Sequence, residues 1–474
     1  MTTTDPCKVL ACKLQKCLRD NLYQPSRCEN VLEDIRQCCI KHAANSIVCD
    51  GIDTSKPYEH NTIDYKINME AVKSAKDRFK KYPLLIAQCE ETAKQYALCV
   101  LEKKTLRKND CEAEFARFKA CVVKAAANID YKVFTDAARH ITEGDTPFKR
   151  HTYRYTPLLA FLLIPNVYVH KDFGKIFFSL VDIVVAVLIR RILTRQKWND
   201  KVVTISVFLW LYNPLTIVIS TRGNADSLAV LPVILTLDFL QRDQFLLAGL
   251  IHGFSVHFRL YPIIFSLAMF LSINKYNRFI PNLNQFKFVN GCAFSLLVLI
   301  GFNYKLYGYQ FLYESFLYHL IRRDAKHNFS VYFYMSYLSS GIEPNLLKKV
   351  LTLLPQIMLL LSLSYKYSDK SNLPFALFTQ AMVIVMYNSV MTSQYFFWFL
   401  SLLPLCLPNI KMSNFRSISL ICAWILSQGI WLFFAYLLEF QGINTFLFIW
   451  ISGLLFFTTN VKILMDLIRC YKAS

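Results

Sequence analysis

Residues 128–159 combine acidic, basic and aromatic side chains at the boundary between two very different parts of the chain. Asp130, Asp136, Glu143 and Asp145 lie among them. Ionisable side chains at this density beside a membrane-spanning region are typical of the rim of a catalytic or transport site. A positioned carboxylate can accept a proton from an attacking hydroxyl. Asp130 and Asp136 are the candidates for that role, and helix capping or simple solvation is the alternative for each.

The two parts of the chain differ in cysteine content and in apolar runs. Eleven of the 15 cysteines lie in the first 121 residues, and none of the apolar runs before residue 150 reaches the ~20 residues needed to cross a bilayer. The chain is therefore predicted to be a soluble head followed by a membrane protein. We do not read its net charge of +20 as nucleic-acid binding, because the cytoplasmic loops of membrane proteins accumulate Lys and Arg.

The head has a regular cysteine spacing. Nine residues separate the members of four pairs, which are Cys7 and Cys17, Cys28 and Cys38, Cys89 and Cys99, and Cys111 and Cys121. On a helix this spacing places two sulfurs ~15 Å apart, so two antiparallel helices can be joined at both ends, Cys7 to Cys38 and Cys17 to Cys28. Each bridge is worth ~2–4 kcal/mol, which such small units need. Zinc binding is less favoured, because no CxxC pair is present.

This pattern resembles the twin-CX9C proteins of the mitochondrial intermembrane space. Residues 1–49, with Cys12, Cys39 and Cys49 in addition, resemble the members with three disulfides. Residues 82–124 resemble the members with two, some of which assist respiratory-complex assembly. The polar residues 50–81 between them are predicted to be a linker.

The body, residues 174–474, is predicted to be a polytopic helical membrane domain. The candidate spans are 174–192, 202–220, 227–240, 245–257, 260–273, 288–303, 350–365, 373–390, 395–410, 417–438 and 443–461. Basic residues fall in alternate connections, and we expect those connections to be cytoplasmic. They include Arg190, Arg191, Arg195, Lys197, Lys201, Arg242, Lys275, Arg278, Lys366, Lys370, Lys411 and Arg416. The opposite side then holds residues 128–173, with an interfacial or re-entrant helix over Thr156–Val169, and the connections 221–226, 258–259, 304–349, 391–394 and 439–442.

Polar residues in those connections are candidates for substrate binding. An Arg at membrane depth costs ~2.5–3.5 kcal/mol unless it meets a phosphate, a carboxylate or water, and guanidinium groups suit phosphate well. Asn328-Phe329-Ser330 is also a glycosylation sequon, and Asp182 is expected to pair with a neighbouring helix. The candidates are Arg154, Arg222, Asn224, Asp226, His257, Arg259, Arg322, Arg323, Asp324, His327, Asn328, Gln394 and Tyr395.

Six blocks of the body resemble one known family in order. They are IDYKVFTDAARH (129–140), TYRYTPLLAFLLIPN (152–166), YNPLTIVISTRGNADSL (212–228), GFSVHFRLYPI (253–263), FLYHLIRRDAKHNFSVYFYMSYL (316–338) and TSQYFFWFLSLLPL (392–405). Together they are similar to the catalytic subunits of glycosylphosphatidylinositol (GPI) mannosyltransferase I over residues 129–466.

The resemblance implies an all-α, GT-C type glycosyltransferase of the endoplasmic reticulum membrane. It would transfer the first α-1,4-mannose, with inversion, from dolichyl phosphate mannose to the glucosamine of the acylated GPI precursor on the luminal face. It also implies a small membrane-anchored stabilising subunit (PIG-X-like). No cofactor and no metal ligands are predicted, metal dependence is left open, and a sugar attached to a lipid needs no nucleotide-binding domain.

The family has a DxD-type acidic pair in its first luminal loop, and Asp130 occupies the second position. Asn128 occupies the first position, and an amide cannot act as a base. The resemblance therefore assigns catalysis to Asp130 or to Asp136.

The head and the body point to different compartments. Family members begin with a transmembrane helix ahead of the acidic loop, whereas a CX9C hairpin precedes it here. Our hypothesis for this combination is a merger of neighbouring reading frames that lost the first exon of the enzyme. Two other functions are considered, a mitochondrial intermembrane-space assembly factor for the head and a transporter for the body, although no internal repeat supports a transporter.

Overall fold

A computed structural model describes residues 5, 7–20, 28–42, 46–49, separate positions between 91 and 117, and 129–274, 280–321, 327–338 and 346–473. The chain divides into two units, residues 1–84 and 85–474, and each is described by itself. The elements of these described residues are helices, with one isolated bridge between Ile410 and Tyr471. The prediction of an all-α membrane protein with a disulfide-bonded head is confirmed.

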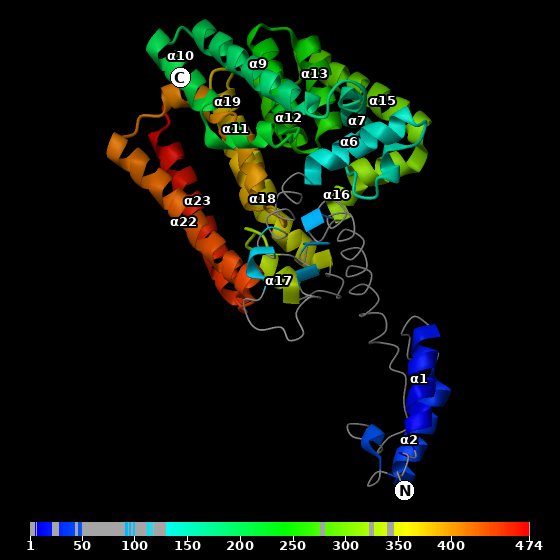
Figure 1. Cartoon of the computed structure of the whole chain (residues 1–474). Helices are drawn as coiled ribbons and strands as arrows, with labels where there is room; N and C mark the ends of the chain where they lie inside the picture. Colours follow the sequence, from blue (N-terminus) through cyan, green and yellow to red (C-terminus); the bar gives the residue numbers. More distant parts are fainter. Residues whose placement is uncertain are drawn as a thin grey trace. The chain divides into compact units, whose positions relative to one another are not determined.

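The first unit is a helical hairpin, drawn in blue in Figure 1. Helices α1 (Lys8–Asp20) and α2 (Glu29–His42) are followed by the short helix η3 (Ile47–Cys49). Disulfides join Cys7 to Cys38 and Cys17 to Cys28, and a third joins Cys39 to Cys49. Because Ile35 and two of these disulfides fill the small core, the bridges supply cohesion that so few apolar residues cannot.

Of the second set of cysteines, Cys99 and Cys111 form a disulfide. Cys89 and Cys121 lie outside the described residues, as do the linker 50–81 and Asn128.

The segment before the body begins with α6 (Ile129–Thr142), so the acidic segment is helical at its start and not a continuous loop. Next come η4 (Pro147–Lys149), α7 (Pro157–Leu162) and α8 (Pro165–Tyr168), where one interfacial helix was expected over Thr156–Val169. Pro157 and Pro165 each start a short helix, because proline fits the first turn and lacks the N–H that an interior position needs.

From Phe173 onward the chain is a set of packed helices. In chain order they are α9 (Phe173–Arg195), α10 (Asp200–Leu211), α11 (Pro214–Thr221), α12 (Asp226–Gln241), α13 (Phe245–Phe258), η5 (Tyr261–Phe265), α14 (Ser266–Ser272), α15 (Leu283–Leu312), η6 (Tyr313–Leu317), α16 (Tyr318–Ile321), α17 (Phe333–Leu338), α18 (Leu346–Lys366), α19 (Leu373–Met386), η7 (Ser393–Tyr395), α20 (Phe396–Leu400), α21 (Leu403–Cys406), η8 (Leu407–Asn409), α22 (Asn414–Gln441) and α23 (Phe446–Cys470).

Three helices of the described residues are long and apolar enough to cross a membrane: Leu283–Leu317, Asn414–Gln441 and Phe446–Cys470. A fourth crossing is counted if α10 and α11, which bend by 43° at their junction, form one span. The predicted span 202–220 is therefore broken, because Asn213 caps a new helix that begins at Pro214. The predicted spans 260–273 and 395–410 consist of short helical pieces, and the span predicted at 288–303 continues to Leu317.

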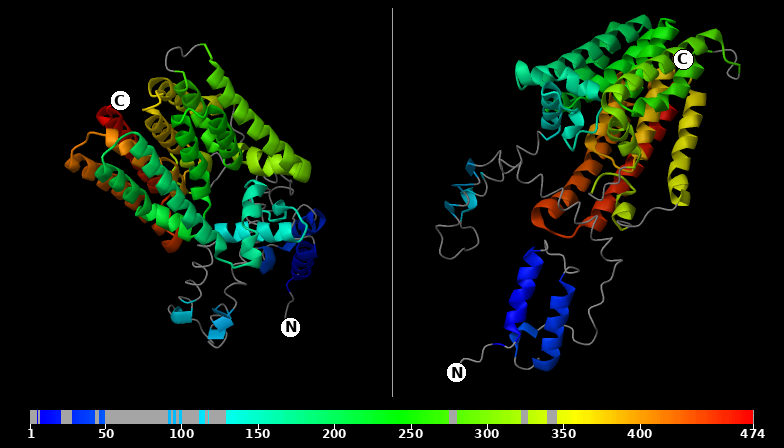
Figure 2. Two further views of the ribbon diagram at one scale, coloured as in Figure 1. Left: turned by 90° about the horizontal axis from the view of Figure 1, so that it is seen from above. Right: turned by 90° about the vertical axis from the view of Figure 1, so that its right-hand side faces the viewer.

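Helices α9 to α13 lie side by side, and α22 and α23 form an antiparallel pair (Figures 1 and 2). Glycines allow α13 and α15 to approach closely, since a Cβ on Gly249 would meet the backbone carbonyl of Phe288 and one on Gly291 that of Leu246. Small residues permit the same close packing in other membrane helices.

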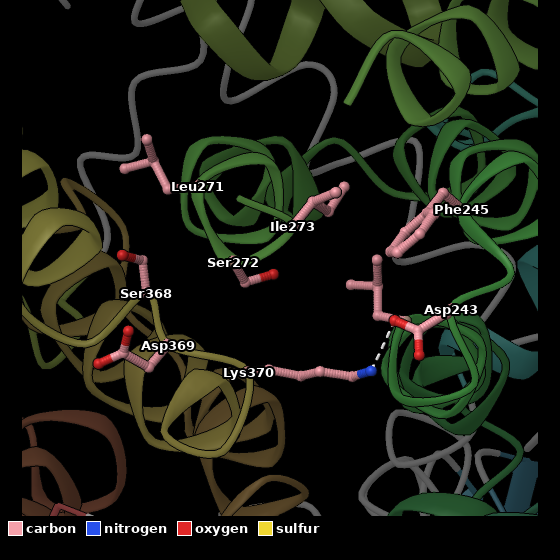
Figure 3. A pocket seen from close by; sticks show the side chains of 9 residues that line it. Asp243, Phe245, Leu271, Ser272, Ile273, Ser368, Asp369 and Lys370 are labelled. Atoms are coloured by element: carbon pink, nitrogen blue, oxygen red, sulfur yellow. Dashed lines mark hydrogen bonds and ion pairs between the residues drawn. The ribbon is translucent and has the colours of Figure 1, made fainter. Parts of the chain in front are cut away.

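Ion pairs gather at those ends of the helices that are predicted to face the cytoplasm. Asp238, near the end of α12, lies 2.8 Å from Arg195 of α9 and 2.5 Å from Arg242. Asp243 and Lys370 pair at 2.7 Å beside a cavity of about 140 Å³, as Figure 3 shows. The helix ends that carry the predicted cytoplasmic basic residues are thus brought together.

Candidate functional site

Helix α6 is fixed to the start of α9 by buried hydrogen bonds around Tyr131. The Tyr131 hydroxyl donates to the Lys171 carbonyl oxygen at 2.8 Å, and the Asn166 side-chain oxygen accepts from the Gly174 N–H at 2.9 Å. Burial raises the pKa of the Tyr131 hydroxyl, so it remains a neutral donor. The residue next to Asp130 therefore has a fixed position.

The structure describes the side chain of only one of the two predicted catalytic acids. Asp130 lies in the first turn of α6, and its side chain is outside the described set. Asp136 lies one and a half turns later and is largely buried, with Oδ1 3.2 Å from Arg139 and Oδ2 3.4 Å from Arg150. Both oxygens of Asp136 are thus engaged within the protein.

Five polar residues from four separate connections form what we call the polar cluster: Tyr155, Asn224, Asp226, Arg259 and Gln394. Asp226, which begins α12, is buried, and its Oδ1 accepts a hydrogen bond from Arg259 Nη2 at 3.2 Å. The guanidinium carbon of Arg259 lies 4.7 Å from the centre of the Tyr155 ring. The carboxylate and the ring hold the guanidinium in place, which favours binding of an anion more than a free side chain would.

The turn between α11 and α12 also reaches a distant part of the chain. Asn224 Nδ2 donates to Gln394 Oε1 at 3.1 Å, although 170 positions separate the two residues. Among the described residues, the buried atoms Asn224 Oδ1 and Thr392 Oγ1 have no hydrogen-bond partner. Buried polar atoms are normally satisfied, so Asn224 Oδ1 could accept a hydrogen bond from a bound molecule, and Thr392 Oγ1 could accept or donate one. Tyr395 stacks on Trp398, with ring centres 4.6 Å apart.

Arg154 is held beside this cluster by η6 and α16, which follow the long helix α15. Its guanidinium forms an ion pair with Glu314 and lies 4.1 Å from the centre of the Tyr318 ring. Ser315 donates to the Tyr155 carbonyl at 3.0 Å, and His319 Nε2 lies 2.8 Å from the Arg154 carbonyl. The π-helical turn η6 therefore holds residues 154 and 155 through both side chain and backbone.

Glu314, Ser315 and Tyr155 were not among the predicted site residues. Glu314 is an acidic residue within an aromatic stretch of the kind found at membrane surfaces. An acid surrounded by aromatic residues is the signal that could have identified it.

Other predicted site residues make their side-chain contacts outside the polar cluster. His257 is fully buried between Phe311 and Phe316, and Asn303 lies 3.4 Å from its Nε2. His327 is 3.6 Å from Glu439. The side chain of Asn328 is also buried and accepts from the Ser330 and Met391 N–H groups at 2.9 and 3.3 Å. An amide used in this way organises its own loop and is a poor acceptor for a glycan, so the sequon interpretation is not supported.

The remaining predicted residues divide into two groups. Arg222 is exposed at the end of α11, in the same turn as Asn224 and Asp226. Arg322, Arg323 and Asp324 lie outside the described residues.

One group of potential metal ligands lies close to α6. Atoms of His140, Glu143 and Asp145 are within 4.8 Å of one another. Glu143 is exposed and the other two are partly exposed, and a hydrogen bond from Lys149 lowers the pKa of Asp145. We assign no metal to it.

The comparisons with known proteins match the two parts of the chain separately. Residues 219–468 match the family described as mannosyltransferase (PIG-M), and residues 6–61 match Cx9C motif-containing protein 4. The catalytic subunit of GPI alpha-1,4-mannosyltransferase I of Danio rerio is 44% identical over 360 residues, covering 73% of this chain and 89% of that protein. GPI mannosyltransferase 1 of Dictyostelium discoideum is 40% identical, covering 72% of this chain and 84% of that protein, and that of Saccharomyces cerevisiae is 40% identical, covering 73% and 88%.

Proposed function

Because this chain belongs to the mannosyltransferase (PIG-M) family, we propose that it is a GPI α-1,4-mannosyltransferase. Its donor is dolichyl phosphate mannose, and its acceptor is the glucosamine of the acylated GPI precursor. The reaction takes place on the luminal face of the endoplasmic reticulum membrane. A small membrane-anchored subunit (PIG-X-like) stabilises the body.

The observation that carries this proposal is the polar cluster. Arg259 is held by Asp226 and Tyr155, and Arg154 is held by Glu314 and Tyr318. Arg259 packs on the ring of Tyr155, which follows Arg154 directly in the chain. Guanidinium groups held in place suit a lipid-linked phosphate, whose negative charge increases as the sugar leaves.

In the reaction, the acceptor hydroxyl oxygen attacks the anomeric carbon of mannose and forms the new glycosidic bond. The bond between that carbon and the phosphate oxygen breaks, and dolichyl phosphate leaves with the electron pair. The hydroxyl proton passes to a carboxylate. Attack from the side opposite the phosphate inverts the configuration of a β-linked donor and gives an α-mannoside.

Asp130 is the better candidate for the proton acceptor. Asp136 has both oxygens engaged with Arg139 and Arg150, so accepting a proton there would disrupt two ion pairs. Helix α6 places Asp130 one position before Tyr131, which is fixed against α9.

Asn224, Gln394 and Thr392 are suited to sugar hydroxyls. Asn224 Oδ1 and Thr392 Oγ1 are buried without a partner among the described residues, and a hydroxyl can both donate and accept. A site built to satisfy such groups discriminates against ligands that lack the matching hydroxyl.

The experiment is a transfer assay in membranes of cells that lack their own enzyme. The full chain, detected by its size, is supplied with labelled dolichyl phosphate mannose and GPI precursor. We expect a singly mannosylated lipid with the wild type, and at least a ~10²-fold lower rate with Asp130→Asn. Absence of product with the wild-type chain present would overturn the proposed function. An undiminished rate with Asp130→Asn would overturn the assignment of the base.

A further inference from the structure

Asp182 is a buried acid that the reaction does not use. It lies in the middle of α9 and is 6% exposed. Ser227 donates its hydroxyl to Asp182 Oδ1 at 2.6 Å, and Ser220 donates to Oδ2. The two serine hydroxyls are 3.0 Å apart. No Lys or Arg of the described residues forms an ion pair with Asp182.

A carboxyl group at this depth is costly. Acidic side chains inside membrane helices are rare, and a hydroxyl pair satisfies them less well than a cation does. An apolar side chain at this position would avoid the cost of burying a carboxyl group. The two hydrogen bonds of Asp182 are therefore the place to look for a role that offsets this cost.

The two serines lie on either side of the turn that carries the polar cluster. Ser220 is near the end of α11 and Ser227 is the second residue of α12, so Asp182 joins both ends of residues 221–226. The Trp210 indole also donates to the backbone carbonyl of Asp182 at 3.0 Å, which fixes the backbone at residue 182 relative to α10.

The turn itself has little freedom to rearrange. Gly223, at its centre, has a φ of +81°, and a Cβ there would collide with the Tyr131 ring. The turn then presents Asn224 to Gln394 and Asp226 to Arg259. A small displacement of either end would therefore move both contacts.

We infer that Asp182 is a positioning residue: through Ser220 and Ser227 it holds the turn 221–226 in the geometry that binds the lipid-linked substrates. The inference rests on the proposed function of the polar cluster. It assigns a role to an acid that touches no substrate, and it distinguishes that role from a general tie between helices.

Asp238 provides the matched control. It is equally buried, and its bond to Arg195 also joins α12 to α9, but it lies about 12 residues, or ~18 Å, beyond the turn along α12. Loss of either acid weakens the same helix pair. Only loss of Asp182 should alter the turn.

The test compares Asp182→Leu, Asp182→Asn and Asp238→Asn in the full chain, with rates normalised to the amount of protein in the membrane. Asp182→Leu should raise KM for dolichyl phosphate mannose or the GPI precursor by roughly tenfold or more, because a misplacement of about 1 Å costs up to ~10²-fold. Asparagine can accept from one serine and donate to the other, so Asp182→Asn should stay within about threefold of the wild type. Asp238→Asn should change the amount of protein and leave KM unchanged.

Two further variants separate the possible outcomes. Addition of Ser220→Ala and Ser227→Ala to Asp182→Leu should change KM no further, since the three residues act as a unit. If the Asp182→Leu protein does not accumulate, Ser227→Ala takes its place in the test. This variant removes one of the two hydrogen bonds to Asp182 and should also raise KM. A wild-type KM in Asp182→Leu or Ser227→Ala would overturn the inference, as would an equal loss in Asp182→Asn and Asp182→Leu. In each of these cases the wild type still transfers mannose; if it does not, the proposed function itself has failed.

Discussion

Arg259 Nη2 lies 3.2 Å from Asp226 Oδ1, and this bond joins the end of α13 to the start of α12. Asp226 also follows the turn that carries Asn224, so one ion pair connects the phosphate-binding and sugar-binding halves of the proposed site. The predictions below start from this pair.

Replacement of Arg259 should lower kcat by an amount that depends on the charge and the shape of the new side chain. Arg259→Leu removes the charge and should lower kcat by about 10²–10³-fold. Arg259→Lys keeps the charge but cannot contact Asp226 and Tyr155 as a planar group does, so it should restore only part of the rate. Steady-state assays with labelled dolichyl phosphate mannose measure both. Equal activity of Arg259→Leu and the wild type would exclude Arg259 from the site.

The two candidate bases should respond differently to amide substitution. Asp136→Asn keeps a side chain that can still accept one hydrogen bond from Arg139 or Arg150, so most of the activity should remain. Asp130→Asn should lose ~10²-fold or more, the usual contribution of a general base. The comparison is made in parallel membranes with equal protein. The opposite order of activities would assign the proton to Asp136.

Glu314 should be needed to hold Arg154. Glu314→Ala leaves the guanidinium on the Tyr318 ring without its carboxylate, and breaking a half-buried pair of this kind should lower transfer about tenfold. Glu439, which is 3.6 Å from His327 and largely exposed, provides the control. Glu439→Ala should stay close to the wild type, and a similar loss in both variants would show that the effect is not specific to Arg154.

Gly223 should tolerate no side chain. Its φ is +81°, and a Cβ would collide with Tyr131, so Gly223→Ala combines backbone strain of ~1–3 kcal/mol with a clash. We expect strongly reduced transfer. Gly301 is helical, and a Cβ on it would meet no atom within 4 Å, so Gly301→Ala should be neutral or slightly stabilising. Transfer by Gly223→Ala at the wild-type rate would show that the turn is not rigid.

Much of the architecture could be predicted from local sequence. The cysteine spacing predicted Cys7–Cys38 and Cys17–Cys28, and the apolar runs predicted most of the long helices. Asp182 was expected to pair with a neighbouring helix, and it does so through Ser220 and Ser227. The bend between α10 and α11 was missed because the apolar run continues through Asn213 and Pro214, which have only local effects on the backbone.

The site was predicted less completely, for a physical reason. The contacts that build it join residues far apart in the chain, such as Asn224 with Gln394 and Arg154 with Glu314. Sequence reasoning could identify which polar residues are costly to bury, and so it found Arg259 and Asp226. It could not identify which of them meet, and it therefore placed Arg259 in one list with His257 and Asn328, whose side chains contact other parts of the chain.

The most direct test of the proposed enzyme is the product formed in membranes that lack any other GPI mannosyltransferase I. With the full chain present, dolichyl phosphate mannose and GPI precursor should give a lipid with a single mannose that α-mannosidase removes. Asp130→Asn at the same protein level should give almost none. Absence of that lipid with the wild-type chain, or its formation at the same rate by Asp130→Asn, would contradict the account.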